Sequence, residues 1–217
     1  LRTNLGATRR SAAQHSQSLH ALVAHIPGLK VALPSSAYEA KGLMKTAIRD
    51  DNPVVIFEDK LMYNDKAPVP EEEYLIPFGE AAVLREGRDI TLVATSSMVQ
   101  VALKAAELLD HDGISAEVID PRTIVPLDEE TIVKSVKKTS RAMVIDEGHR
   151  NFGITGEIAS RITEKAFYHL DAPVIRMGAM DVPVPFSPAL EDITVPTPEA
   201  VAENARLSVR GELFDAA

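Results

Sequence analysis

The chain has 217 residues, no cysteine and a formal net charge of −9 at pH 7. A chain without cysteine has no disulfide, no thiolate nucleophile and no zinc–sulfur site. The acidic balance argues against nucleic acid as a partner, because nucleic-acid binders carry a basic surface. The apolar runs are too short to span a bilayer, so we expect no membrane partner either.

The chain begins at Leu1 without an initiating methionine, and its first six residues have the character of a loop already in progress. We therefore expect a fragment of a longer polypeptide, or a processed piece. Its length is compatible with one large domain or with two small ones.

The stretch 13–19 is predicted to open an amphipathic helix. Counting from His15, four apolar residues follow at the spacing of one helical face, namely Leu19, Leu22, Val23 and Ile26. This spacing places His15 on the same inward face, in the first turn, where the positive end of the helix favours a neutral imidazole. Because a neutral imidazole donates or accepts a proton near neutral pH, His15 is the first candidate catalytic residue. The alternative is a histidine that only forms a hydrogen bond at a helix start.

Two strands and a helix are predicted next. Residues 29–33 form a short apolar strand that ends at Pro34, and apolar residues at helical spacing between 40 and 48 predict a helix. The β-branched run 54–57 is typical of a strand buried on both faces. Residues 58–77 are polar and rich in proline, which predicts a linker between domains. Their acidic run, 71–73, is predicted to be a solvated surface rather than a metal site.

A more regular alternation follows from about residue 78. Strands are predicted at 90–94, 117–119, 142–145 and 174–177, and helices at 98–109, 132–136, 154–162 and 198–210. Strands and helices of these lengths in alternation predict a parallel, doubly wound α/β architecture.

The turn 47–53 is a candidate cation site. The last carbonyls of a helix lack intrahelical partners, and Asp50 and Asp51 lie beside its negative end. A positive group must compensate them, either Arg49 and Lys45 or a bound cation. Carbonyls with the Asp50 and Asn52 side chains would form the oxygen shell that hard cations prefer. A solvated turn with a local arginine–aspartate pair is the alternative.

The turn 146–151 follows a predicted strand, at the end where open α/β sheets place ligand crevices. His149 is a second candidate there, although a hinge or interface role for this charged turn is favoured, because no nucleophile lies nearby in the sequence. No phosphate-binding glycine loop, nucleophilic serine elbow or HExxH motif occurs. The chain therefore carries no complete catalytic set, and another segment or another chain must complete one.

Several motifs resemble one enzyme family in order and spacing: Ala13-Gln14-His15-Ser16-Gln17, Pro27-Gly28-Leu29-Lys30, Ala40-Lys41-Gly42-Leu43, Ile48-Arg49-Asp50-Asp51-Asn52-Pro53, Val118-Ile119-Asp120-Pro121-Arg122-Thr123 and Asp181-Val182-Pro183-Val184-Pro185. The chain resembles, over nearly its whole length, the beta subunits of the thiamine-diphosphate-dependent dehydrogenase component of 2-oxo acid dehydrogenase complexes. The motifs Phe57-Glu58-Asp59-Lys60 and Pro185-Phe186-Ser187-Pro188 are closer to the acetoin and pyruvate members than to the branched-chain members.

This resemblance implies two domains. Residues 1–77 would be the later half of a transketolase-like pyrimidine-binding domain with a linker, and residues 78–217 a transketolase carboxy-terminal domain. It also implies a heterotetramer of two alpha and two beta subunits, with thiamine diphosphate between alpha and beta. The diphosphate and its magnesium would lie on the alpha side, and a lipoyl acyltransferase would accept the acyl product.

The resemblance also assigns roles to particular residues. His15 matches the active-site histidine of the family, which assists acyl transfer to the lipoyl group. The turn matches a potassium site, with ligands on Ala47 and Ile48 through their carbonyls and on Asp50 and Asn52. The family's cofactor-binding glutamate and a further potassium ligand have no counterpart in this chain. We therefore expect the chain alone to be inactive and its cation site to be incomplete.

Three rival interpretations remain. A transketolase or a deoxyxylulose-phosphate synthase would share both domains but would not be expected to carry the motifs around His15 and Asp50. A branched-chain 2-oxo acid dehydrogenase subunit is the second rival, and a non-catalytic assembly fragment of such a complex is the third. The expected compartment is the bacterial cytoplasm, or the mitochondrial matrix for a eukaryotic source.

Overall fold

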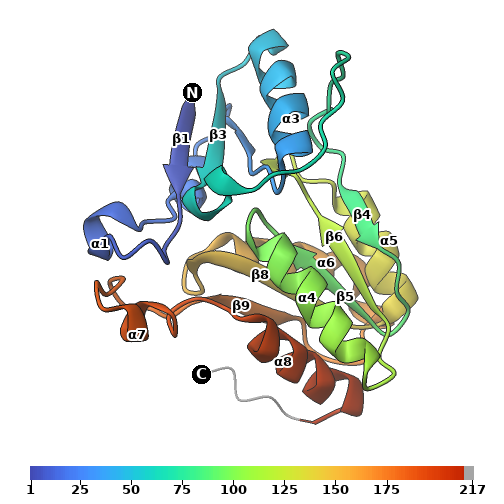
Figure 1. The fold of residues 1–217 in the computed structure, drawn as a ribbon. Coiled ribbons are helices and arrows are strands. Elements are labelled where there is room, and N and C mark those ends of the chain that lie inside the picture. Colours follow the sequence, from blue (N-terminus) through green and yellow to red (C-terminus); the bar gives the residue numbers. More distant parts are fainter. Residues whose placement is uncertain (213–217) are drawn as a thin grey trace.

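The computed structural model describes residues 1–212 and contains two β-sheets with helices packed on their faces (Figure 1). The first sheet has the order β1 (Arg2–Leu5), β3 (Val54–Asp59), β2 (Lys30–Ala32) and β7 (Thr123–Val125). The second has the order β4 (Ala82–Arg85), β6 (Ala116–Asp120), β5 (Ile90–Ala94), β8 (Ala142–His149) and β9 (Ile175–Ala179). The helices are α1 (Ala12–His15), α2 (His20–Ala24), α3 (Ala37–Arg49), η1 (Lys60–Asn64), α4 (Met98–Asp110), α5 (Glu129–Thr139), α6 (Ile154–Ala166), η2 (Phe167–His169), α7 (Pro188–Glu191) and α8 (Pro198–Arg210).

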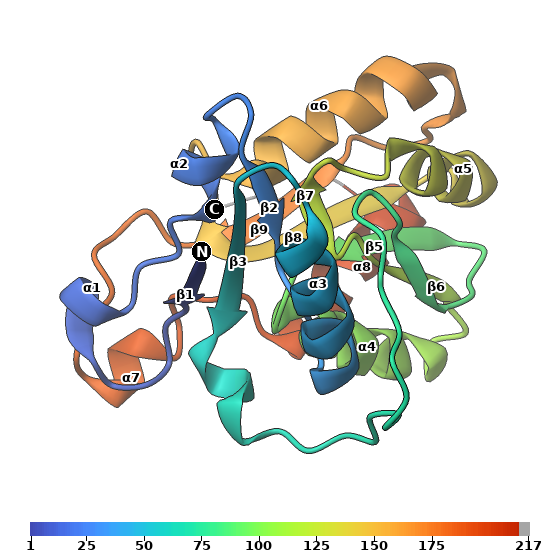
Figure 2. The same ribbon diagram turned by 90° about the horizontal axis from the view of Figure 1, so that it is seen from above.

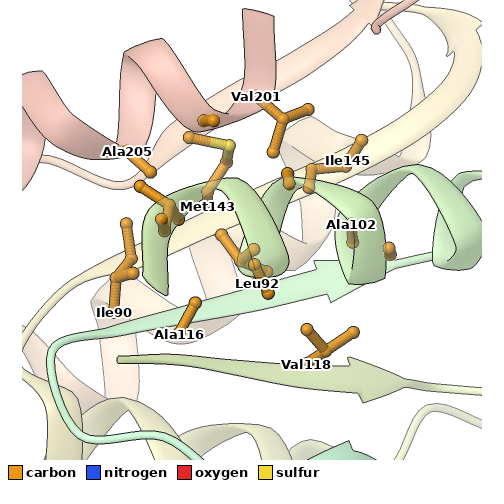
Figure 3. Packing of buried hydrophobic residues seen from close by; sticks show 14 of the residues in the cluster. Ile90, Leu92, Ala102, Ala116, Val118, Met143, Ile145, Val201 and Ala205 are labelled. Atoms are coloured by element: carbon orange, nitrogen blue, oxygen red, sulfur yellow. The ribbon is translucent and has the colours of Figure 1, made fainter. Parts of the chain in front are cut away.

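The second sheet is doubly wound, as the alternation predicts. Its strands β5, β6, β8 and β9 run parallel, and only the edge strand β4 is antiparallel to its neighbour β6. One face packs against α4 and α8, where Leu92, Met143 and Val201 belong to a fully buried apolar cluster (Figure 3). Side chains alternate along β5, so Val93 points to the other face and joins the cluster that contains residues of α5 and α6.

We call each sheet with its helices a unit. The first sheet lies between α3 and the second unit, which contains the second sheet. Ala32, Val54 and Ile56 pack with Leu43 of α3 in one apolar cluster. Residues on the other face of these strands, including Val55 and Phe57, belong instead to the large cluster that also contains Val93, Ile119 and Ile158. One continuous core therefore joins the two sheets. The short strand β7 reinforces this connection, because it follows β6 in the chain but pairs antiparallel with β2 of the first sheet.

Most elements lie where periodicity predicts them. Strand β5 and helix α8 have the predicted bounds, and α3 begins earlier than expected because Ser36 caps it by accepting hydrogen bonds from the Tyr38 and Glu39 backbone. The short strands β1, β4 and β7 were not predicted, because three or four half-buried residues carry little periodic signal. No helix in the described part of the chain is long and apolar enough to cross a membrane.

The predicted amphipathic helix at 13–26 is wrong. The structure has two short helices, α1 and α2, separated at Ser16–Leu19. Three of the four apolar residues that were expected to face inward are exposed, with Leu19 at 47%, Leu22 at 66% and Ile26 at 50%, whereas Val23 packs against the core. Serine favours turns over helix interiors, and a buried contact of His20 fixes the orientation of α2. Tertiary contacts therefore override the apparent period.

The segment 65–81 connects the two sheets and contains no helix or strand. It packs along α3 rather than leaving the surface, because Ile76 is buried and Tyr74 stacks on Tyr38 with ring centroids 4.5 Å apart. Residues 71–73 are exposed, which agrees with a solvated surface, and Glu73 forms an ion pair with Arg49.

Candidate functional site

His15 is the last residue of α1 and lies exposed at the surface of the first unit. The structure thus corrects two expectations: His15 neither faces the core nor stands at the start of a helix, so the argument from a positive helix end does not apply. Its backbone carbonyl accepts a hydrogen bond from the Lys60 ammonium group at the start of η1. Among the described residues, none is hydrogen-bonded to its imidazole ring. The ring is therefore open to a ligand or to a partner chain.

The carboxyl ends of β5 and β8 form the topological switch point of the second sheet. The chain leaves β5 toward β6 on one side, whereas β8 adds on the other side, and open α/β sheets place ligand crevices at such points. Here first-unit residues fill the crevice. His20 of α2 is 1% exposed, and its Nε2 lies 2.9 Å from Oδ2 of Asp146 in β8.

The contact between His20 and Asp146 lies at the boundary between the two sheets, which we call the seam. Asp146 is the most heavily hydrogen-bonded group there. It accepts hydrogen bonds from the Thr95 hydroxyl and from the Gly148 backbone, as well as from His20, whose Nε2–H must be the donor because a carboxylate only accepts. Burial raises the pKa of Asp146, but these donors outweigh it and hold the pKa below its usual value. Nδ1 of His20 is buried without a partner among the described residues.

A pair of carboxyl groups, those of Glu147 and Asp59, lies beside this seam. Glu147 accepts hydrogen bonds from the Ala7 backbone and from the Ser97 hydroxyl, and both carboxyl groups approach Gly6, where a Cβ would lie 2.9 Å from Asp59 Oδ1. Burial first, and the neighbouring Asp59 second, raise the pKa of Glu147 well above its ordinary value. Both causes disfavour the charged form of the Glu147 carboxyl group.

A fourth buried carboxyl group, that of Asp120, joins the sheets at β6. Asp120 is fully buried, accepts a hydrogen bond of 2.5 Å from the Ser35 hydroxyl and accepts the Arg122 backbone N–H. Burial raises its pKa to about 6, although these two donors oppose the shift. Arg122 in turn pairs with Glu39 of α3 at 3.2 Å. The interface between the two units is thus polar and titratable at three places.

The chain turns at the end of α3, where the cation site was predicted. Asp50 ends α3, and its carboxylate accepts hydrogen bonds from the Asn52 backbone and amide groups and from Lys30 of β2 at 2.5 Å. The Lys30 contact is the main reason that the pKa of Asp50 falls to about 2. The compensating positive group is therefore Lys30, and not Arg49 or Lys45. The Ala47 carbonyl accepts the Asp50 N–H at 3.4 Å, and Ile48 is exposed at 74%.

His149 ends β8, and its Nδ1 lies 2.8 Å from the Met180 carbonyl, which holds the loop after β9. The predicted turn 146–151 is wrong for most of its length, because residues 146–149 continue strand β8. His20, Asp59 and Glu147 were missed or not assigned a role by sequence reasoning. Only Glu147 had a sequence signal. Together with Asp146, it follows a predicted strand, at the end where open α/β sheets place ligand crevices.

Comparisons with known proteins agree with this architecture. Residues 1–66 match the transketolase pyrimidine-binding domain, and residues 79–201 match the transketolase C-terminal domain. The chain is 50% identical over 212 residues to the beta subunit of acetoin:2,6-dichlorophenolindophenol oxidoreductase of Bacillus subtilis, covering 98% of this chain and 62% of that protein. It is 49% identical over 198 residues to the pyruvate dehydrogenase E1 beta subunit of Rickettsia felis, covering 91% of this chain and 61% of that protein.

A solved structure described as a split-gene transketolase, an inactive beta4 tetramer, superposes with a TM-score of 0.78 at 27% identity, and the match covers 96% of this chain and 65% of that chain. The chain spans about three-fifths of the length of the two curated relatives above. Family matches, identity and fold lead to one conclusion. The chain belongs to the family of proteins with a transketolase C-terminal domain, preceded here by a match to the transketolase pyrimidine-binding domain.

Proposed function

We propose that this chain is part of the beta subunit of a thiamine-diphosphate-dependent acetoin or pyruvate dehydrogenase. The observation that carries the proposal is the 50% identity to an acetoin oxidoreductase beta subunit over 98% of the chain. The proposed partners are an alpha subunit, a second beta subunit and a lipoyl acyltransferase. We also propose that residues 1–77 and 78–217 are its two functional units, of which the last five residues lie outside the described part.

The cofactor would be only partly held by this chain. Within residues 1–212, no group of three histidine or acidic side chains is placed to hold a metal ion. We propose that the alpha subunit binds the diphosphate and its magnesium. When bound, thiamine diphosphate supplies the nucleophilic carbon that cleaves the substrate.

His15 would supply a proton or a hydrogen bond as the two-carbon acyl group passes to the lipoyl sulfur. Two features support this role: its ring is exposed, and no described residue engages either ring nitrogen. An imidazole that is accessible in this way can donate a proton or a hydrogen bond to a partner within hydrogen-bond distance. Its backbone is meanwhile held by Lys60.

The test is His15→Ala in the full-length subunit, assembled with its alpha partner and thiamine diphosphate. We expect normal assembly and a fall in lipoyl acylation of roughly 10²–10⁴-fold, the usual contribution of general acid–base catalysis. The control is His111→Ala, at an exposed histidine beyond α4. An unchanged acylation rate in the His15 variant would remove the proposed role.

We further propose that the turn at Ala47, Ile48, Asp50 and Asn52 binds potassium. The support is a helix end rich in oxygen atoms. Because Lys30 already neutralises the Asp50 carboxylate, the carbonyls are expected to dominate the ligand set. Exchange of potassium for sodium should lower the thermal midpoint of the assembled enzyme, whereas equal midpoints would count against the site.

A non-catalytic assembly fragment is the second candidate, and the observation that favours it is the likeness to the inactive beta4 tetramer. The same assays with acetoin and pyruvate distinguish the two and choose between the substrates. For the compartment we propose the bacterial cytoplasm, or the mitochondrial matrix for a eukaryotic source. One relative, from Arabidopsis thaliana, is itself named mitochondrial.

A further inference from the structure

The segment that leads into α1 has an unusual backbone. Thr8, Arg10 and Ala12 have φ angles of 63°, 56° and 55°, so three alternate residues that are not glycine adopt the left-handed region. This region is unfavourable for residues with a Cβ and persists only where the surroundings impose it. A local constraint must therefore hold residues 8–12, which directly precede His15.

Arg10 provides that constraint through the second unit. Its guanidinium forms a two-nitrogen contact with Asp192, at 2.6 Å and 3.0 Å, and contacts Oε2 of Glu191 at 2.9 Å. The backbone N–H of Arg10 also donates to Glu191 Oε2, at 3.0 Å. These carboxyl groups belong to α7 and its end, which lies beside α1 in both views of the molecule (Figures 1 and 2).

Arg10 thus contacts Glu191, a residue that has no access to solvent. Its exposed fraction is 0%, and its Oε1 has no hydrogen-bond partner among the described residues. A buried carboxylate requires a paired charge, and Arg10 is the cation that the structure places against it. A planar guanidinium that binds two carboxyl groups also restricts orientation, which a single ammonium group does not.

His15 is thus held from two sides. On one side Lys60 donates to the His15 carbonyl, and Arg9 donates to the Lys60 carbonyl. On the other side the strained turn is fixed to α7 by Arg10. The partners of the Arg10 side chain lie about 180 positions further along the chain, so a long-range contact sets its orientation and α1 does not.

We propose that Arg10 is a positioning residue for His15, and that Glu191 and Asp192 act through it. The cluster holds the left-handed turn 8–12, and this turn sets where the imidazole ring stands when the acyl group is transferred. The inference rests on the proposed function, because it assigns a partner to the proposed role of His15.

The experiment uses the full-length subunit assembled with its alpha partner and thiamine diphosphate. The variants are Arg10→Ala and Arg10→Lys, and the matched control is Arg206→Ala, which removes another two-carboxylate arginine cluster, with Asp112 and Glu203 on the α4 and α8 side. Two rates are measured for each: acylation of a lipoyl domain, and reduction of the dye 2,6-dichlorophenolindophenol, which needs no lipoyl group.

We expect Arg10→Ala to lower kcat for lipoyl acylation by roughly 10–100-fold, the effect of misplacing a reacting group by about 1 Å. KM for the lipoyl domain and the dye rate should change less than about twofold, and Arg10→Lys should retain an intermediate rate because it keeps the charge but loses the two-nitrogen contact. Hydrogen exchange should rise in the peptide 7–16 alone. If Arg10→Ala does not assemble, Arg10→Lys carries the same comparison.

The double variant Arg10→Ala/His15→Ala separates the two proposals. If Arg10 acts through His15, the double variant acylates no more slowly than His15→Ala alone, because residues that act as a unit are not additive. Two outcomes would overturn the positioning role while leaving that of His15 intact. In the first, the acylation losses of the two single variants multiply in the double variant. In the second, Arg10→Ala lowers the dye rate and the lipoyl acylation rate equally. If His15→Ala has no effect by itself, the proposed role of His15 fails first.

Discussion

The imidazole of His20 and the carboxylate of Asp146 meet at 2.9 Å across the seam between the two sheets. Both side chains are almost fully buried, at 1% and 3% exposure. The pair occupies the switch point at which an α/β sheet of this kind offers a ligand crevice. In this chain that point serves to join the two units, and the candidate chemistry lies at the surface around His15.

Replacement of His20 by alanine should destabilise the protein by about 2–4 kcal/mol, because it removes a hydrogen bond to a buried carboxylate and leaves a cavity. Urea unfolding measures this loss. His25→Ala, at an exposed histidine directly after α2, is the control and should change stability by less than about 0.5 kcal/mol. Equal effects of the two substitutions would show that the seam pair contributes nothing specific.

Glu147→Gln should reduce the pH dependence of stability. The pKa of Glu147 is raised in the folded state above its ordinary 4.5, so the folded protein binds the proton more tightly than the unfolded chain. Its contribution is complete below about pH 4.5 and is lost as the pH rises toward the folded pKa. The unfolding free energy of the parent should therefore fall more steeply above pH 4.5 than that of the variant. Glu130→Gln, at an exposed position of α5, should reproduce the parent curve.

Two helical glycines should respond oppositely to alanine. A Cβ at Gly42 of α3 would lie 2.5 Å from Ile76 Cγ1 and 2.9 Å from Tyr74 Cε2, so Gly42→Ala should displace segment 65–81, lower stability by about 1–3 kcal/mol and expose this segment to proteases. A Cβ at Gly156 of α6 would meet only Arg176, at 3.6 Å. Gly156→Ala should therefore stabilise by up to about 1 kcal/mol. Matching signs for the two variants would contradict this packing.

Lys30→Met should raise the pKa of Asp50 from about 2 toward its ordinary 3.8, because the Lys30 ammonium group is the main cause of the depression. The lowered pKa means that this carboxylate contributes stability above pH 3.8, which is lost as the pH falls through about 2. Carboxyl carbon shifts in an NMR titration report the change directly. Lys134→Met, at an exposed position of α5, is the control and should leave the Asp50 titration unaltered.

Local sequence rules were sufficient for the second sheet and its helices. Fully buried parallel strands such as β5 are uninterrupted apolar runs, and α8 has a proline at its start, a capping Thr197 and Gly211 at its end. These signals act within a few residues and need no partner. The same rules placed Asp50 in a turn after α3. They did not place Lys30 against it, because Lys30 belongs to strand β2.

Sequence patterns predicted the alternation of strands and helices, the α/β class and the motifs that resemble one enzyme family. The position of His15 depends on tertiary packing, because the exposed fractions of Leu19, Leu22 and Ile26 are set by what packs against them. It also decided that His20 meets Asp146 and that Arg10 meets Glu191, contacts separated by 126 and 181 positions. Periodicity describes the face of one element, whereas a buried charge is satisfied by whichever residue the fold brings to it.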